Sequence, residues 1–308
     1  MVTERLKSSL LFLIKYAIGL GLLFWILHRV DAHRVWATLR SIPAGTLFVL
    51  ELLSLCGLLF QFILWRFLVS QHSERHDIRD LLASFLAGFA FRLMLPGGHA
   101  EVSKVFLLKG RRRGKVMAFG AEKFFQTLFK IIFISLALMV IYPQKKLLLI
   151  TLSLAGVFVF LFLPHLLHTE KWQNFQEKEV AYHRVFRWSL MLTIPGFLII
   201  AGQYYLLLLN MAPIKWTEAV LVTTFIWGAG LIPISISGLG VRENLAVYFL
   251  GLYNVPSATA VGASLLIFTI NVIVPAIAGV IIIIRRRHQL GNARGEVYSF
   301  FNRVLRKK

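Results

Sequence analysis

The sequence predicts an all-α polytopic membrane protein, an inverted repeat with about six full spans and two re-entrant hairpins. Apolar residues make up 57% of the 308 residues and are collected in long runs. About 20 apolar residues are needed for a helix to cross about 30 Å of hydrocarbon, and several runs reach this length. Two shorter runs each lead into a Gly- and Pro-containing segment followed by a glutamate, which is typical of transporters built from repeats.

Full crossings are predicted where the apolar runs are longest. These runs lie at roughly 8–27, 46–69, 116–142, 146–164, 188–209 and 257–284. The first is too long for the core of a signal peptide and has no small-x-small cleavage site after it, so we interpret it as a retained span. Residues 29–43 place apolar side chains at helical spacing between Arg and His, which predicts an amphipathic helix on the membrane surface.

Two shorter apolar runs, 79–95 and 217–237, could each cross fully or form the descending arm of a re-entrant hairpin. Each is followed by a short predicted helix, at 101–108 and 243–252. With hairpins, both termini and most of the 34 Lys and Arg residues fall on one side of the membrane, the cytoplasmic one by the positive-inside rule. Full crossings would move the GRRRGK cluster to the opposite face. The charges therefore favour hairpins in a protein integral to the cytoplasmic (inner) membrane, with cytoplasmic N- and C-termini.

The two hairpin segments resemble each other. Placing residues 81–130 over 223–272 without a gap aligns Gly98 with Gly240, and Glu101 with Glu243. Three full spans separate the hairpins, an odd number, so the two halves are inverted relative to the membrane. Substrates of such inverted repeats bind near the bilayer midplane, between the halves.

The predicted domain organisation follows from this repeat. Residues 1–285 form one transmembrane domain with half-repeats of about 1–142 and 143–285, and residues 286–308 form a basic cytoplasmic tail. The net charge of +20 comes from short clusters beside apolar runs, which favours contact with anionic lipids at the cytoplasmic face and not with nucleic acid. The lone Cys56 excludes an internal disulfide framework.

Catalytic and cofactor motifs are missing from the sequence. It has no Walker motif, no dinucleotide fingerprint and no HExxH. We therefore expect no catalytic residue, no cofactor and no metal site, and we expect a transporter more than an enzyme.

Charged residues inside the apolar runs are the candidate site, because a charge at the bilayer centre costs about 2.5 to 3.5 kcal/mol on insertion scales. Lys130 lies seven residues after Lys123, deeper in the apolar run and on the same side of the predicted helix. One interpretation is structural, with Arg242 paired to Glu101 or Glu122 paired to Arg92. The other is an anion site, with backbone N–H groups at the hairpin tips joining the cations. The candidate substrate-binding residues are Arg92, Glu101, Glu122, Lys123, Arg242 and Glu243.

Proline and glycine mark the predicted hinges of the hairpins. Hydrocarbon cannot hydrogen-bond an unwound backbone, so such segments must face protein or a polar cavity. The hinge residues are Pro96, Gly97, Gly98, Pro233, Gly238 and Gly240. Asn271, inside the last apolar run, is expected to form an interhelical hydrogen bond.

Two motifs resemble the flippase-like membrane family named after the transmembrane region of lysylphosphatidylglycerol synthases. They are LPGGHAEVSKVFLLK at 95–109 and PISISGLGVRE at 233–243. The family's Glu-Arg pair corresponds to Glu122 and Lys123, and its basic residue after the first glutamate corresponds to Lys104. A later acidic residue of the family is Gln126 here, which argues against proton coupling through this helix. The resemblance covers essentially the whole chain.

This resemblance, together with the charge pattern, implies a lipid translocase. It would move a phospholipid, an aminoacyl-phospholipid or a polyprenyl-phosphate-linked lipid between leaflets. Arg242 and Lys123 would hold the phosphate, and Glu101 and Glu243 would orient the cations or meet a positively charged headgroup. The chain resembles a stand-alone member without the soluble aminoacyl-transferase domain, so we expect no lysyl transfer.

Two alternatives remain open on the sequence. The first is a membrane-embedded transferase for a lipid-linked sugar or glycolipid, with Glu101 or Glu243 as the base. The second is an accessory subunit in such an assembly, whose partner would be a lipid-synthesising enzyme.

Overall fold

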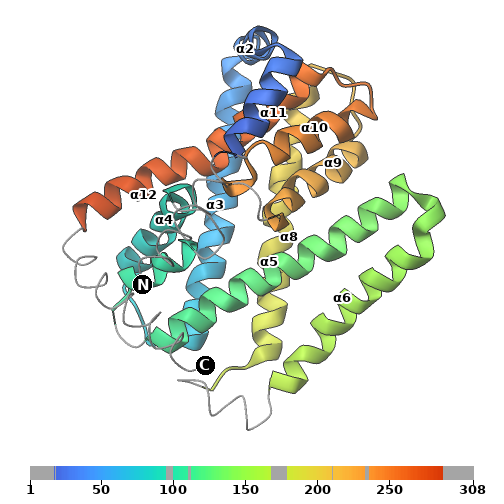
Figure 1. The fold of residues 1–308 in the computed structure, drawn as a ribbon. Coiled ribbons are helices and arrows are strands. Elements are labelled where there is room, and N and C mark those ends of the chain that lie inside the picture. Colours follow the sequence, from blue (N-terminus) through green and yellow to red (C-terminus); the bar gives the residue numbers. More distant parts are fainter. Residues whose placement is uncertain are drawn as a thin grey trace, which may run out of the picture.

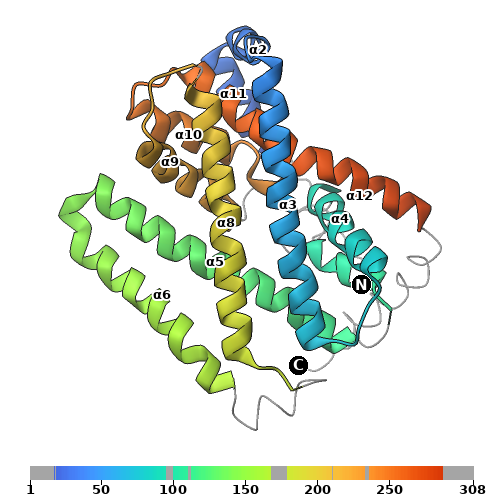
Figure 2. The same cartoon turned by 180° about the vertical axis from the view of Figure 1, so that it is seen from behind.

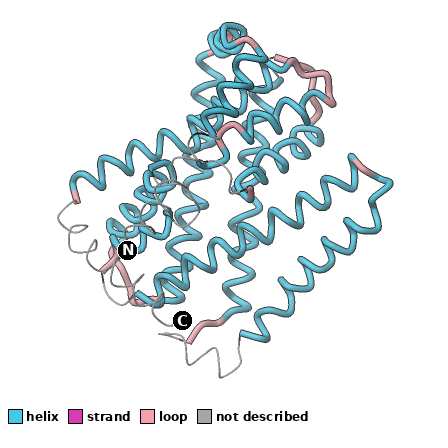
Figure 3. Tube along the Cα trace, viewed as in Figure 1, coloured by secondary structure: helices cyan, strands magenta, loops and turns pink. Residues whose placement is uncertain are grey.

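The computed structural model describes residues 17, 19–94, 100–109, 112–167, 179–209, 211–232 and 236–286. Within these ranges every regular element is helical, which confirms the predicted all-α class (Figure 3). Helices suit apolar sequences in a membrane because they satisfy every backbone polar group internally. After the helix Gly19–Val30 the elements are α2 (Ala32–Arg40), α3 (Ala44–His72), α4 (Ile78–Met94), η1 (Ala100–Leu107), α5 (Arg112–Ile141), η2 (Pro143–Lys145), α6 (Lys146–Leu167), α8 (Tyr182–Leu209), α9 (Trp216–Gly228), η3 (Ala229–Leu231), η4 (Ile236–Gly238), α10 (Val241–Gly251), α11 (Ser257–Phe268), η5 (Thr269–Ile273) and α12 (Val274–Arg285).

Five helices are long and apolar enough to cross a membrane: α3, α5, α6, α8 and the continuous helix from α11 to α12. They match five of the six predicted spans. The remaining one, 8–27, lies mostly outside the described residues, and its described part belongs to the helix Gly19–Val30. The predicted surface helix is α2, in which Val35 is buried against Ile26 and Val261.

A π-helical turn, η5, interrupts the last long helix and ends two residues before Pro275. Proline lacks an N–H and its ring collides with the carbonyl four residues earlier in a regular α-helix. The wider turn accommodates this residue. It also presents Asn271 to its neighbours: the side chain donates to Gln203 Oε1 at 2.6 Å, while Gln203 Nε2 donates to Leu50 O at 2.9 Å. The predicted interhelical role of Asn271 is confirmed.

The long helices form a framework around the shorter elements. Helices α3 and α8 run side by side through the length of the molecule (Figure 2). Helices α5 and α6 form an antiparallel pair along one side (Figure 1). Two apolar cores hold this framework, one around Trp65, Phe125 and Phe186, the other around Leu207 and Phe225.

The first hairpin, α4 with η1, folds back on itself. Ser84 Oγ donates to Lys104 O at 2.8 Å, so the returning arm lies beside the middle of α4. A Cβ added at Gly88 would lie 2.9 Å from Lys104 Cδ, which explains the small residue there. The predicted returning helix at 101–108 is a 3-10 helix. The hinge residues Pro96, Gly97 and Gly98 lie outside the described residues.

The second hairpin, from α9 through η3 and η4 to α10, also doubles back. The rings of Phe225 and Phe249 stack with centroids 3.8 Å apart, which places the two arms in contact. The first arm stops being α-helical at Gly228, earlier than the predicted end at residue 237, and continues as a 3-10 turn to Leu231. The hinge residue Pro233 lies outside the described residues.

Each hairpin packs against a crossing helix of the opposite predicted half: α4 against α12, and α9 against α5. The α4 to α12 contact is close. A Cβ added at Gly279 would lie 2.2 Å from Leu86 O, and Arg286 pairs with Asp80 at the end of the two helices. The division into half-repeats at residues 142 and 143 stays a prediction.

Candidate functional site

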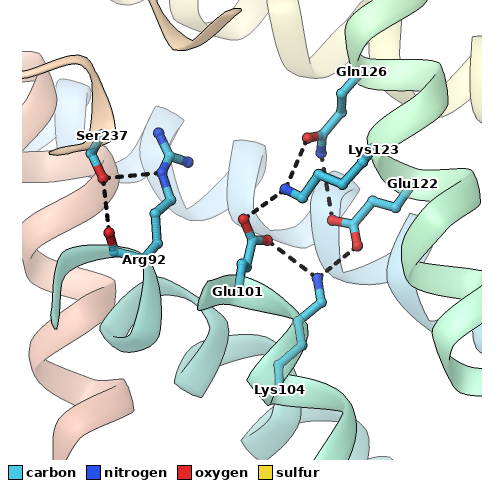
Figure 4. A network of polar contacts seen from close by, with 7 residues as sticks. All are labelled: Arg92, Glu101, Lys104, Glu122, Lys123, Gln126 and Ser237. Carbon is cyan, nitrogen blue, oxygen red and sulfur yellow. Dashed lines mark hydrogen bonds and ion pairs between the residues drawn. The ribbon is translucent and has the colours of Figure 1, made fainter. Parts of the chain in front are cut away.

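The tips of the two hairpins meet in the centre of the molecule. Arg92 Nε donates to Ser237 Oγ at 3.2 Å, and this hydroxyl donates to Arg92 O at 3.4 Å (Figure 4). Ser237 has a φ of 53°, an unusual value for a residue with a side chain, so the contact holds a strained turn. Two segments separated by 145 residues in the sequence thus form one structure.

The second tip depends on glycine. Gly238 and Gly240 have φ values of 77° and 79°, in the left-handed region where a side chain costs about 1 to 2 kcal/mol. At Gly240 an added Cβ would also lie 2.8 Å from Gly19 O. Both were predicted as hinge residues. Their backbone geometry explains why glycine occupies these positions.

A buried cluster of lysines and carboxylates lies beside the first hairpin (Figure 4). Lys104 is its centre, with Nζ 2.6 Å from Glu122 Oε2 and 3.3 Å from Glu101 Oε1. Its side chain is only 1% exposed, and the ammonium also lies 4.0 Å from the centre of the Trp65 ring. Lys104 therefore pairs with two carboxylates at once and fixes η1 against α5.

Lys123 completes this cluster. Its Nζ lies 2.6 Å from Glu101 Oε2 and donates to Gln126 Oε1 at 3.2 Å. Glu101 therefore bridges two ammonium groups, and Gln126 links back to Glu122 at 3.5 Å. The structure brings the predicted residues Glu101, Glu122 and Lys123 together, but they are paired within the protein. Lys123 pairs with Glu101, and Glu122 pairs with Lys104.

Glu243 caps the second hairpin's returning helix. Its Oε2 accepts the Gly240 N–H at 2.6 Å, and its Oε1 accepts the Ser264 hydroxyl at 3.1 Å. The side chain is 0% exposed. A carboxylate here satisfies a free N–H and interacts favourably with the positive end of the helix dipole. Arg242 Nη2 lies 3.5 Å from Oε1 of the same carboxylate.

The structural pairings proposed from the sequence are wrong. Arg242 pairs with its neighbour Glu243 and not with Glu101, while Glu122 pairs with Lys104 and not with Arg92. The physical reason is proximity along the folded helices: Lys104 lies one turn after Glu101 on η1, and it faces α5. Lys104 was noted only as part of a motif, and its partners could not be read from spacing alone.

A central cavity of about 170 Å³ lies between the hairpins and the long helices. Residues of α3, α4, α5, α8, α9, α10 and the π turn line it, and so do residues of η3 and η4. Within the described part of the chain, its charged lining is basic. The polar side chains that line the cavity include those of Gln61, Arg92, Gln126, Lys130, Arg242 and Asn271.

Lys130 is the charged residue of the cavity lining that is absent from the predicted substrate-binding residues. No ion pair or hydrogen bond joins it to any residue that the structure describes, and its ammonium lies 5.0 Å from the centre of the Trp227 ring. A Cβ added at Gly230 would lie 3.1 Å from Lys130 Nζ, so a glycine makes room for the charge. The depth of Lys130 in its apolar run was the available signal.

The cavity lies near the middle of the long helices. Gln61 is central in α3, Lys130 is central in α5, and Gly196 is central in α8. If these helices cross a bilayer, the cavity is near its midplane, where a cation without a partner is costly. An anion is the ligand that such a lining fits.

Residues 12–279 match the family model described as the lysylphosphatidylglycerol synthase TM region. The match covers far more than half of the chain and includes both hairpins. A comparison with curated proteins finds no match.

Proposed function

Because this chain belongs to the family of the lysylphosphatidylglycerol synthase transmembrane region, an integral membrane family with a lipid-related role, we propose that it is a lipid translocase. It moves a phosphate-bearing amphipathic lipid between the leaflets of the cytoplasmic membrane. The headgroup passes through the central cavity while the acyl or prenyl chains stay in the bilayer. The N- and C-termini lie in the cytoplasm, as the positive charges favour.

The observation that carries this proposal is the central cavity itself. Arg92, Lys130 and Arg242 line it at mid-length of helices that can cross a membrane. A lipid phosphate needs such a polar passage, because the hydrocarbon around it offers no hydrogen bonds. Both hairpins contribute a cation, as expected where substrate sites lie between the halves of a transporter.

Movement of the headgroup requires the cavity to open toward one leaflet and then the other. We place this motion where the two hairpins meet. Among the described residues the side-chain hydrogen bonds between them involve only Arg92 and Ser237, and the second tip turns on two glycines. The sequence carries no ATPase motif, so exchange is downhill or coupled to an ion.

A transferase would need an available base, and the carboxylates are poor candidates. Glu101 is bound by two ammonium groups, and Glu243 is 0% exposed and serves as a helix cap. Neither lines the central cavity. Formation of a lipid-linked sugar product that depends on a divalent metal would nevertheless favour the transferase.

Leaflet exchange in liposomes tests the translocase. The purified protein is reconstituted with a headgroup-labelled lipid, and label in the outer leaflet is removed chemically at set times. We expect exchange well above that of empty vesicles, and a roughly ten-fold or greater loss in Arg242→Ala, because a charge-assisted hydrogen bond contributes about 1.5 to 3 kcal/mol.

The matched control is Arg66→Ala, which removes the same charge from an exposed position on α3 outside the cavity. It should exchange lipid at close to the wild-type rate. Equal rates in wild type, Arg242→Ala and empty vesicles would remove the proposal.

A further inference from the structure

We infer that the central cavity selects a headgroup carrying two negative charges on phosphate, a phosphomonoester or a diphosphate, and that Lys130 is one of its ligands. The inference narrows the substrate class of the proposed translocase and rests on that proposal for the lipid as the source of the phosphate. Its chemistry follows from the lining of the cavity.

Carboxylates near the cavity are turned away from it and already bound. Glu101 and Glu122 share Lys104, and Glu101 also binds Lys123. Glu243 binds the Gly240 N–H and the Ser264 hydroxyl. None of the three lines the cavity. Among the described residues, the cavity therefore has no carboxylate that would pair with the ammonium of a zwitterionic or aminoacylated headgroup.

Two aromatic faces of the cavity, those of Trp227 and Phe268, already hold a cation of the protein. The Lys130 ammonium lies 5.0 Å from the centre of the Trp227 ring, and the Arg242 guanidinium lies 3.7 Å from that of Phe268. Both rings line the cavity. A second cation placed there would compete with the protein's own cations and be repelled by them.

The charges of this region leave room for a dianion. Among the described residues of the cavity lining and its neighbouring ion pairs, there are five basic side chains and three carboxylates, an excess of two basic groups. They are Arg92, Lys104, Lys123, Lys130 and Arg242, and Glu101, Glu122 and Glu243. A phosphodiester headgroup with one negative charge neutralises half of this excess. A phosphomonoester, which carries about −1.5 to −2 at pH 7, or a diphosphate neutralises all of it.

The size of the cavity agrees with this class. At about 170 Å³ it is smaller than the roughly 300 to 1,000 Å³ of sites that enclose a whole drug-sized ligand. A phosphomonoester or a diphosphate is small enough for a cavity of this volume.

Lipid binding to the purified protein tests the inference separately from transport. Native mass spectrometry in detergent compares phosphatidic acid (a phosphomonoester), phosphatidylglycerol (a diester) and phosphatidylcholine (a zwitterion) with the same acyl chains. We expect phosphatidic acid to bind about ten-fold or more tightly than phosphatidylglycerol, because its second negative charge allows one additional charge-assisted contact. Phosphatidylcholine should bind weakest.

Three variants assign the selectivity to Lys130. Lys130→Gln should reduce the preference for phosphatidic acid to near that for phosphatidylglycerol, and Lys130→Arg should keep most of it. Lys145→Gln removes the same charge from an exposed turn and should leave the preference unchanged. Equal binding of the three lipids, or an unchanged preference in folded Lys130→Gln, would overturn the inference.

Soluble anions identify the source of the phosphate. Glycerol 3-phosphate and inorganic diphosphate should displace phosphatidic acid only at concentrations about 100-fold higher than the lipid, because they lack the chains that partition into the micelle. Displacement at equal concentration would overturn the lipid assignment. Selective binding without leaflet exchange refutes the translocase alone, whereas exchange without selectivity refutes this inference alone.

Discussion

Arg92 and Ser237 bind each other in both directions, with the guanidinium donating to the hydroxyl and the hydroxyl donating to the Arg92 carbonyl. The pair joins the tips of two hairpins that lie far apart in the sequence. It also borders the central cavity, which both residues line. A contact at this point can control whether the cavity stays closed.

Locking the two tips together should stop lipid exchange. Cα atoms of α4 and η4 approach within 8 Å, so Arg92→Cys with Ser237→Cys suits a short, cleavable thiol crosslinker. The exposed Cys56 is first replaced by serine. The reference is the uncrosslinked double variant, whose exchange is already lowered by the loss of the Arg92 charge. We expect exchange to fall from that rate to the level of empty vesicles after crosslinking and to return to it after cleavage. Undiminished exchange in fully crosslinked protein would show that the tips do not separate during transport.

The buried Lys104 and the half-buried Lys130 should respond in opposite ways to the same substitution. Lys104→Met leaves Glu101 and Glu122 short of a partner and should cost about 3 to 5 kcal/mol of unfolding free energy. Lys130→Met removes a cation that has no carboxylate partner among the described residues, so the ligand-free protein should be unchanged or more stable. Thermal unfolding in detergent, followed by circular dichroism, measures both. A large loss of stability in Lys130→Met would mean that this lysine is structural.

Gly240→Ala should destabilise the second hairpin. Its φ of 79° costs an alanine about 1 to 2 kcal/mol, and the added Cβ would collide with the helix Gly19–Val30. The control is Gly251→Ala at the end of α10, where an added Cβ meets nothing within 4 Å and alanine favours the helix. Thermal unfolding of the two variants side by side gives the comparison, and equal midpoints would contradict the strain at Gly240.

Two helix caps of the same type differ in burial, which gives a matched pair. Glu243 accepts the Gly240 N–H and Glu218 accepts the Lys215 N–H, each from the start of its own helix. Glu243→Ala should cost about 1 to 3 kcal/mol, because it leaves a buried donor unsatisfied. Glu218→Ala should cost less, since water can replace the carboxylate at this more exposed helix start. A similar loss of stability in both would indicate that burial does not set the strength of the cap.

Much of the fold follows from the sequence alone because apolar length decides which segments can cross a membrane. The spans at 46–69 and 257–284 correspond to α3 and to the helix from α11 to α12. The ends of elements were less predictable: the second hairpin's first arm leaves the α-helix at Gly228, where an added Cβ would lie 2.4 Å from Ile134 Cδ1. Such close helix packing depends on tertiary structure that no local pattern contains.

The candidate site was predictable in its residues more than in its pairings. Depth in an apolar run identified Arg92 and Arg242 as unusual charges, and both line the central cavity. The same criterion could not distinguish Lys130 from Lys123, which lies seven residues earlier on the same helix. Lys130 lines the cavity, whereas Lys123 is bound to Glu101. That distinction depends on where the returning arm of the first hairpin places its glutamate.

The packing of Gly279 against Leu86 O restricts which parts of the molecule can shift. Two backbones this near one another leave no space for sliding side chains, and the pairing of Arg286 with Asp80 fastens the same helices at their far end. Helices α4 and α12 must therefore travel as a single rigid body. In the proposed translocase, the rearrangement that admits a lipid is therefore expected in the second hairpin, which turns at Gly238 and Gly240.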